Sequence, residues 1–254
     1  MKTRNSSEGY TLVELLVTVG IILILMSLVL AAVKKVHGKA RSTACLNNFR
    51  QLGYGFQLYT EDNQDTFPAG ASAQHYGPHP EDWIWWHNGR DVRKSSLVPY
   101  MGEFNADLFR CPADEEALRH PTDVVIEGNP YRYSYSLTSY QNYDEFNPGL
   151  ATLISRDRKL ILPFRTSMVK DPSGQMLLVE EDRRSLDDGR WVPGDFFEKE
   201  GKEWRPRSGA DPRLVQILTR RHYKRGNVLF LDNHIEAFDH NRGFDLRLSN
   251  PFIN

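Results

Sequence analysis

The most strongly patterned part of this chain is an apolar run near its start. No ionisable side chain occurs between Leu15 and Val33, a stretch of 19 residues. At about 1.5 Å of rise per residue, a helix of this length spans about 28 Å, the thickness of a bilayer's hydrocarbon core. Glu14 stands at its beginning, where an unpaired carboxylate at membrane depth costs roughly 2.5 to 3.5 kcal/mol. The pattern predicts a membrane anchor over about residues 12–33 and a partner for Glu14.

A helical pattern continues beyond the anchor. Five residues at alternating steps of four and three share one helix face: Cys45, Phe49, Leu52, Phe56 and Tyr59. We therefore predict one helix over residues 10–60, about 75 Å long at about 1.5 Å per residue. Asp62, Asn63 and Pro68 are expected to end it. Its outer half is amphipathic and needs a surface to pack against.

Shorter patterns further along the chain indicate strands. Tyrosine alternates with polar residues over residues 131–140, and an apolar run at 176–180 follows a turn at 172–174. We predict an α+β fold in which the outer half of the long helix packs on a C-terminal antiparallel sheet. Long irregular insertions are expected between about Ala69 and Arg213.

Composition limits the function only weakly. Lys and Arg total 32 against 33 Asp and Glu, so no excess of positive charge indicates a nucleic-acid partner. The mean hydropathy is negative despite the apolar run, which predicts a water-facing domain. No nucleophile–base pair, phosphate-binding loop or paired-carboxylate pattern occurs, so we predict neither an enzyme nor a cofactor.

The residues around the anchor resemble the class III signal of type IV prepilins and type II secretion pseudopilins. In that family a prepilin peptidase cuts after a glycine, here Gly9, and methylates the new amino terminus, here Tyr10, where Phe is commoner. The family's glutamate five residues into the mature chain corresponds to Glu14. The resemblance implies a leader of residues 1–9 and an assembly role in which Glu14 neutralises the amino terminus of a neighbouring subunit.

Two other interpretations of the anchor remain. A secretory signal peptide usually has an apolar region of 7 to 15 residues and a small-residue cleavage site, but here Lys34, Lys35 and Lys39 follow a longer run. An uncleaved signal anchor would leave the grouping of Gly9, Tyr10 and Glu14 unexplained.

The orientation of the anchor does not follow from charge alone. Lys2 and Arg4 precede it, whereas Lys34, Lys35, Lys39 and Arg41 follow it, which is opposite to the positive-inside rule for an exported C-terminal domain. The resemblance nevertheless implies a single-pass protein of the cytoplasmic (inner) membrane, because its peptidase acts at the cytoplasmic face. The C-terminal domain is then extracytoplasmic, and the subunit can belong to a periplasmic or surface filament.

A second resemblance lies near the end of the chain. His222 and Asp232 have the spacing of the H-x9-DG element found in prepilin-like proteins with the same type of N-terminus, with Asn233 in place of the usual glycine. Asn tolerates positive φ, so a two-residue turn at Asp232 and Asn233 can still join strands at 227–231 and 234–238. A metal site of His222, Asp232 and His234 is an alternative, but a hydrogen-bonded turn explains these residues without a metal.

The chain has two cysteines, Cys45 and Cys111. In an exported domain they are expected to form a disulfide that ties the amphipathic helix to the globular part and contributes about 2 to 4 kcal/mol. Two buried free thiols are the alternative. No CxxC or Cys/His spacing indicates zinc, so no metal ligands are predicted.

Two clusters are assigned to structure rather than to binding. A group of aromatic residues could form a surface on which a sugar or peptide stacks, but a role in the core or in anchoring a loop is expected. The group contains Trp83, Trp85 and Trp86, with His75, His79 and His87 nearby. The acidic group Glu180, Glu181, Asp182, Asp187 and Asp188 raises the question of calcium, but it matches no EF-hand loop and is interleaved with arginines, so a solvated charged loop is expected.

Together these patterns predict a pilin-like or pseudopilin-like subunit of a type II secretion or type IV pilus filament. Its parts are a leader (1–9), a long helix (10–60) and an exported globular domain (61–254). Its expected partners are membrane lipid, prepilin peptidase, other pilin-like subunits and the assembly machinery, with no nucleic acid. The alternative is a periplasmic binding module or enzyme that uses the helix only as a tether.

Overall fold

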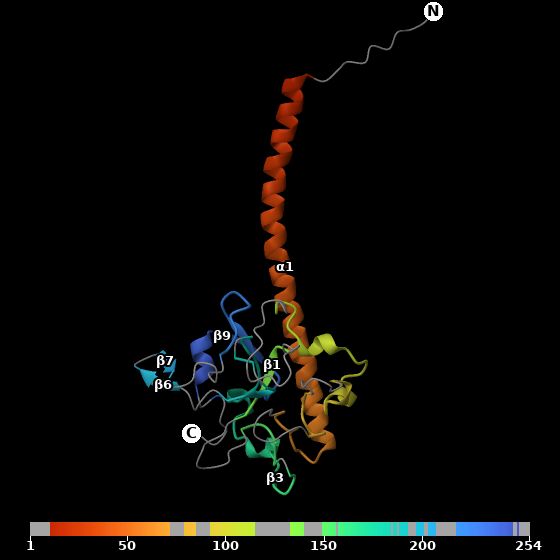
Figure 1. Cartoon of the computed structure of the whole chain (residues 1–254), viewed down its shortest axis with the longest axis vertical. Coiled ribbons are helices and arrows are strands. Elements are labelled where there is room, and N and C mark those ends of the chain that lie inside the picture. The colour runs from red at the N-terminus through yellow and green to blue at the C-terminus, as the bar shows by residue number, and fades with distance from the viewer. Residues whose placement is uncertain are drawn as a thin grey trace, which may run out of the picture. The chain divides into compact units, whose positions relative to one another are not determined.

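A computed structural model describes most of the chain (Figure 1). The described residues are 11–71, 79–84, 92–114, 133–139, 149–155, 157–183, 185–186, 188–192, 197–200, 203–206, 217–245 and 248. By its internal contacts the chain divides into two compact units, Met1–Ala40 and Arg41–Asn254.

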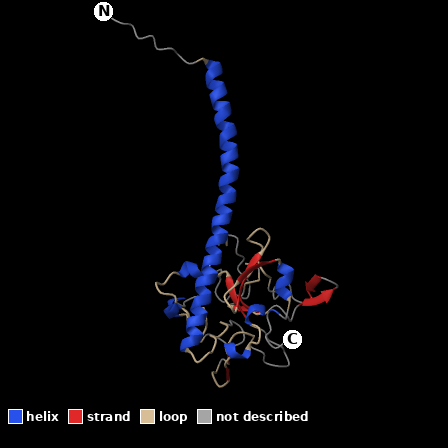
Figure 2. Cartoon of the chain, turned by 180° about the vertical axis from the view of Figure 1, so that it is seen from behind, coloured by secondary structure: helices blue, strands red, loops and turns tan. Residues whose placement is uncertain are grey.

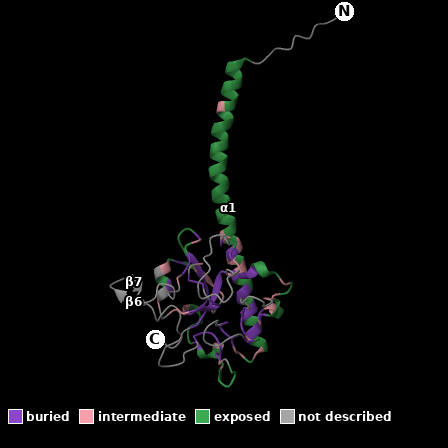
Figure 3. Cartoon of the chain, viewed as in Figure 1, coloured by how far each residue is buried: buried purple, intermediate pink, exposed green. Residues whose placement is uncertain are grey.

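The first long element is α1, Leu12–Asp62. Its bounds agree closely with the predicted helix over residues 10–60. Within the first unit its apolar side chains are exposed, with Leu16 at 70% and Leu28 at 64% (Figure 3). This part of the helix is long and apolar enough to cross a membrane. In water such a surface is unfavourable, so lipid or other apolar helices must cover it.

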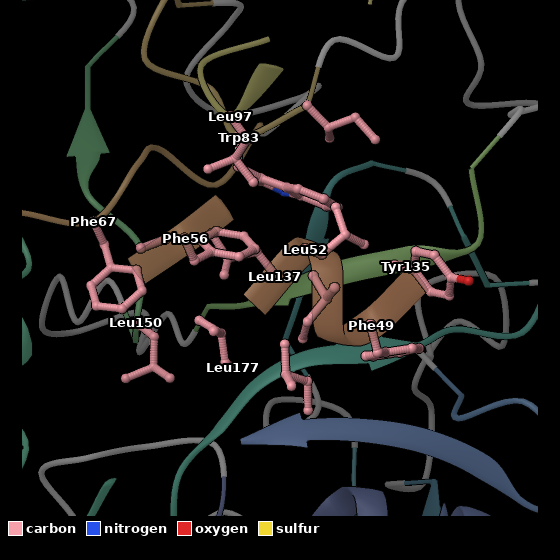
Figure 4. Close-up of a cluster of buried hydrophobic side chains, with 14 of the residues drawn as sticks. Phe49, Leu52, Phe56, Phe67, Trp83, Leu97, Tyr135, Leu137, Leu150 and Leu177 are labelled. Atoms are coloured by element: carbon pink, nitrogen blue, oxygen red, sulfur yellow. The ribbon is translucent and has the colours of Figure 1, made fainter. Parts of the chain in front are cut away.

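The part of α1 within the second unit carries the predicted apolar face. Cys45, Phe49, Leu52 and Phe56 are at most 1% exposed, and Tyr59 is 8% exposed. Phe49 packs edge-on against Tyr135, with ring centroids 4.6 Å apart, and Phe56 lies 5.8 Å from Trp83 (Figure 4). The helix ends where predicted, because Gln64 and Asp65 adopt left-handed conformations and Asp65 N donates back to Thr60 O.

A five-stranded sheet forms the centre of the second unit (Figure 2). Its spatial order is β5 (Arg190–Trp191), β1 (Tyr135–Thr138), β4 (Met176–Glu180), β8 (Gly226–Phe230) and β9 (Ile235–Phe238). All pairings are antiparallel except that of β1 with β5. Leu52 and Phe56 of α1 lie in one buried cluster with Leu137 of β1 and Leu177 of β4. The predicted α+β fold, a long helix with an antiparallel-dominated sheet, is confirmed.

Short elements complete the described chain. Two small antiparallel pairs are β2–β3 (Leu153–Ile154, Ile161–Leu162) and β6–β7 (Phe197–Glu200, Glu203–Pro206). The 3₁₀ helices are η1 Val92–Lys94, η2 Val98–Tyr100, η3 Ala106–Phe109, η5 Thr166–Met168, η6 Pro172–Gly174 and η7 His240–Phe244. The strand predicted at 176–180 has the expected bounds, and the tyrosine-rich stretch contributes the shorter strand β1. All four residues of β1 are buried, so its polar positions face the interior.

The β8–β9 hairpin forms, but its turn differs from the prediction. Leu229 pairs with Ile235, Phe230 N donates to His234 O, and Asn233 N donates to Phe230 O. The loop therefore has three residues, and Asn233 at φ 69° is the left-handed residue that closes it. The predicted two-residue turn was wrong, because Asp232 occupies an ordinary turn position and only the position normally held by glycine needs positive φ.

Candidate functional site

Two places in the described chain carry functional chemistry, and the first is the start of α1. Thr11 N and Thr11 Oγ1 both donate to Glu14 Oε2 at 2.8 Å, and Glu14 N donates to Thr11 Oγ1 at 3.3 Å. This reciprocal arrangement is a capping box, which satisfies backbone groups that an α-helix leaves open at its N-terminus. Glu14 thus has a partner within its own chain, which the sequence interpretation did not foresee. Gly9 and Tyr10 lie outside the described residues, so the cleavage point stays a prediction.

The second place is a buried polar cluster within the second unit. We call it the Cys–His–Glu cluster and define it as Cys45, Cys111, Glu180 and His222. Each residue offers one ligand atom, and these four atoms all lie within 4.8 Å of one another. Three of the residues are 0% exposed and His222 is 6% exposed.

Four separate segments position the cluster. Cys45 lies on the buried face of α1, Cys111 follows η3, and Glu180 is the last residue of β4. His222 lies in a tight turn before β8, closed by His222 N donating to Arg225 O and Arg225 N donating to His222 O. The central residues of this turn, Tyr223 and Lys224, have φ values of 52° and 68°. Two successive non-glycine residues in the left-handed region cost roughly 1 to 2 kcal/mol each, so the turn holds His222 at a conformational cost.

Short polar contacts link the members of the cluster. Cys111 Sγ lies 3.2 Å from His222 Nε2, which lies 3.1 Å from Glu180 Oε1. The cysteines are free thiols in the structure. Because both sulfur atoms lie in the same cluster, the disulfide stays a prediction.

A surrounding layer of donors orients the cluster. Asn227 donates through its backbone N and its Nδ2 to Glu180 Oε2, both at 3.2 Å, and Nδ2 also lies 3.5 Å from Cys45 Sγ. Tyr135 Oη lies 3.4 Å from Cys45 Sγ, and Ala113 N donates to Cys111 Sγ at 3.4 Å. Each sulfur and the carboxylate thus receive polar contacts from fixed groups.

A buried arginine contributes charge beside the cluster. Arg221 Nη1 lies 3.5 Å from Glu180 Oε1, and Arg221 Nη2 lies 3.1 Å from Asp114 Oδ2. Asp114 in turn accepts a hydrogen bond from Ser134 Oγ at 2.6 Å. This positive charge compensates part of the cost of burying the two carboxylates.

The protonation states follow from these neighbours. Burial raises the pKa of Glu180, but the hydrogen bond and charge of His222 and the charge of Arg221 outweigh it, so the net pKa is lowered. Burial lowers the pKa of His222, whereas its contacts with Cys111 and Glu180 raise it to about 10. The hydrogen bond to Cys45, burial and the charge of Glu180 raise the pKa of Cys111. These pKa shifts favour a protonated Cys111 thiol beside an imidazolium–carboxylate pair of His222 and Glu180.

The two residues that define the H-x9-D spacing, His222 and Asp232, lie in different parts of the domain. His222 belongs to the Cys–His–Glu cluster, whereas Asp232 lies at the hairpin tip beyond the five residues of β8, which span roughly 16 Å. Asp232 Oδ1 accepts from His234 N at 3.1 Å and contacts His234 Nδ1. The structure does not bring His222, Asp232 and His234 into one metal site, and the turn interpretation of Asp232 and His234 holds.

Two other expectations have mixed outcomes. Trp83 is a core residue as predicted, with Nε1 donating to Gly189 O at 2.8 Å, while Trp85, Trp86, His75 and His87 lie outside the described residues. The solvated acidic loop was wrong for Glu180, Glu181 and Asp188, which are buried. Glu180 ends a central strand, and Glu181 accepts a 2.5 Å hydrogen bond from Ser136, so their side chains face the interior instead of water. Asp187 lies outside the described residues.

Comparison with known proteins identifies the amino-terminal segment. Residues 4–30 match the family model described as the prokaryotic N-terminal methylation motif. The match contains Gly9, Tyr10 and Glu14 and most of the apolar run, and it supports a type IV pilin-like or pseudopilin-like protein with a prepilin-type signal. A single pass through the inner membrane is consistent with this signal and with α1. Neither the curated proteins nor the solved structures give a match.

Proposed function

We propose that this chain is a structural subunit, not an enzyme, of a type II secretion or type IV pilus-type filament. Prepilin peptidase cleaves it after Gly9 and methylates Tyr10. The domain beyond the anchor lies on the extracytoplasmic side of the inner membrane. The observation that carries the proposal is the methylation-motif match over residues 4–30, which coincides with a helix whose apolar side chains are exposed.

The exposed apolar side chains of α1 can be covered in two different environments, a lipid bilayer or a filament. Lipid covers such side chains in the monomer, and the helices of neighbouring subunits can cover them in a filament. Transfer between the two environments leaves the apolar contacts nearly unchanged, so packing and polar pairing decide the association.

Glu14 supplies the polar pairing in this proposal. Its capping bonds with Thr11 go to one oxygen, Oε2, and a carboxylate has acceptor capacity for further donors. Cleavage after Gly9 creates an ammonium group at Tyr10. In a medium of low dielectric constant, a neighbouring subunit's ammonium group and Glu14 attract each other strongly, which sets the axial register of the two helices.

Replacement of Glu14 by Gln tests this role. Gln is accepted at the same position of a capping box, so Glu14→Gln removes the charge while the start of the helix is retained. The variant, expressed in its native system, should be inserted and processed but should lose cross-linked oligomers and incorporation into filaments. Immunoblots of cross-linked membranes and of sheared filaments measure both properties.

Thr11→Val is the matched control, because it removes the hydroxyl of the capping box and keeps the Glu14 charge. It should assemble as the wild type does. Normal assembly of Glu14→Gln, or an equal loss in Thr11→Val, would contradict the pairing role. Absence of oligomers in the wild-type protein would instead favour a tethered module.

A further inference from the structure

We propose that the Cys–His–Glu cluster is a structural zinc site with Cys45 Sγ, Cys111 Sγ, His222 Nε2 and Glu180 Oε1 as its ligands. Thiolate, imidazole and carboxylate are the three ligand types that Zn²⁺ takes in proteins, and four of them make a closed tetrahedral site. This proposal departs from the sequence-based prediction that the chain has no metal ligands. It does not depend on the proposed filament function.

The distances between the ligand atoms suit a small tetrahedral ion. With Zn–S near 2.3 Å and Zn–N or Zn–O near 2.0 to 2.2 Å, the edges of the tetrahedron measure roughly 3.3 to 3.8 Å. Two edges of the cluster measure 3.2 and 3.1 Å, and every remaining pair of ligand atoms lies within 4.8 Å. The 4.8 Å upper limit exceeds the longest ideal edge by only about 1 Å.

The surrounding donors match the outer shell of a thiolate site. Asn227 Nδ2 and Tyr135 Oη contact Cys45 Sγ, and Ala113 N donates to Cys111 Sγ. Asn227 also holds Glu180 through Oε2, which directs Oε1 to the interior of the cluster. Such partners orient metal ligands and stabilise their charge.

The burial of the ligand side chains indicates that the proposed zinc ion has a structural role and not a catalytic one. The cysteines and Glu180 are fully buried, and all four coordination positions come from the protein, which leaves no position for a substrate. The ion would join α1, the segment after η3, β4 and the turn before β8. The left-handed conformations of Tyr223 and Lys224 are consistent with a turn that is constrained to present His222.

A disulfide between Cys45 and Cys111 is the competing arrangement. It would join only two of the four segments, and Glu180 and His222 would then serve only as an ion pair beside it. A disulfide also excludes zinc from the cluster, because it consumes the two thiolates that make up half of the proposed ligands. The two arrangements therefore predict opposite results for thiol titration.

Metal content and thiol state of the full-length protein test the site. The wild-type chain, isolated from its native membrane in detergent without chelators, should contain about one zinc per chain by elemental mass spectrometry. Both cysteines should be alkylated after denaturation without reductant. After chelation under reducing conditions, Co²⁺ should give the sulfur-to-cobalt charge-transfer and tetrahedral d–d absorption bands of a thiolate site.

Ligand variants provide the second measurement. Cys45→Ser and His222→Gln should weaken Zn²⁺ binding at least about 100-fold in competition with a chromophoric chelator, because each removes a direct ligand. His234→Gln removes a histidine outside the cluster and should retain wild-type affinity. A Cys45–Cys111 disulfide in the native protein, or no zinc together with no Co²⁺ bands in the reduced wild type, would overturn the proposal. Full zinc content in Cys45→Ser would also do so.

Discussion

Asn233, at the tip of the β8–β9 hairpin, lies directly against Gly53 of α1. A Cβ atom at Gly53 would collide with Asn233 Oδ1 and would lie 3.2 Å from Leu229 Cδ2. Asn233 Nδ2 also donates to Gln57 Oε1 at 3.1 Å. The asparagine therefore closes the hairpin through its positive φ and fixes the hairpin to the helix through its side chain, a role that glycine cannot fill.

This contact predicts that the effect of Gly53→Ala on the free energy of unfolding changes sign when Asn233 is replaced. Alanine in place of a helical glycine normally stabilises by up to about 1 kcal/mol. In the wild-type protein, Gly53→Ala should instead destabilise by about 1 to 3 kcal/mol, because Asn233 must move and lose its bond to Gln57. In an Asn233→Gly background the collision partner is absent, and Gly53→Ala should be neutral or stabilising. Urea unfolding of the four proteins in detergent measures the coupling.

Gly55→Ala is the matched control for this cycle. A Cβ atom there would make only ordinary contacts, the nearest at 3.5 Å from Met101 Cε. The effect of Gly55→Ala should be the same in both backgrounds. An effect of Gly53→Ala that does not depend on residue 233 would show that the observed contact has no energetic consequence.

Tyr59 predicts a pH dependence of stability at alkaline pH. Burial, followed by the charge of Glu81 and the neighbouring Tyr100, raises the pKa of Tyr59 to about 12. An unfolded tyrosine has a pKa of about 10, so this group's contribution to stability is fully present below pH 10 and is lost as the pH rises towards 12. Tyr59→Phe should therefore show a shallower fall in the free energy of unfolding across this range.

Tyr54→Phe, at a 60% exposed position of the same helix, is the control for that measurement. Its free energy of unfolding should follow the wild-type pH dependence. Equal slopes in Tyr59→Phe and the wild type between pH 10 and 12 would contradict the effect of burial on Tyr59.

The elements that the sequence predicted well depend on local patterns. The bounds of α1 and the buried positions of Phe49, Leu52 and Phe56 follow from a 3.6-residue period, which neighbouring residues determine among themselves. The β8–β9 hairpin was also predictable from neighbouring residues, because two short apolar runs flank a turn sequence. Its loop length was not, because the first strand ends at Phe230, one residue earlier than the sequence pattern predicted, which adds Leu231 to the loop.

The Cys–His–Glu cluster could not be predicted in this way. Its members are separated by 66, 69 and 42 positions along the chain, so no spacing rule connects them. Glu180 was assigned to a charged loop because Glu181 and Asp182 follow it. In the structure it ends β4, pairs with Tyr135 of β1 and is fully buried. His222 attracted attention as part of H-x9-D, but the partner implied by that spacing, Asp232, lies elsewhere.

The processing step gives the last prediction. If prepilin peptidase recognises the segment as proposed, the mature chain begins at Tyr10 with a methylated amino group, and Gly9→Val abolishes cleavage because a branched side chain replaces the residue on which the peptidase acts. Gly20→Val is the control: a Cβ atom at Gly20 would meet no atom within 4 Å, so this change leaves the helix surface free of collisions. N-terminal mass analysis of protein from native membranes should find Tyr10 in the wild type and in Gly20→Val, and the leader retained in Gly9→Val. An intact leader in the wild-type protein would remove the ammonium group that Glu14 is proposed to bind and would leave α1 as a simple anchor.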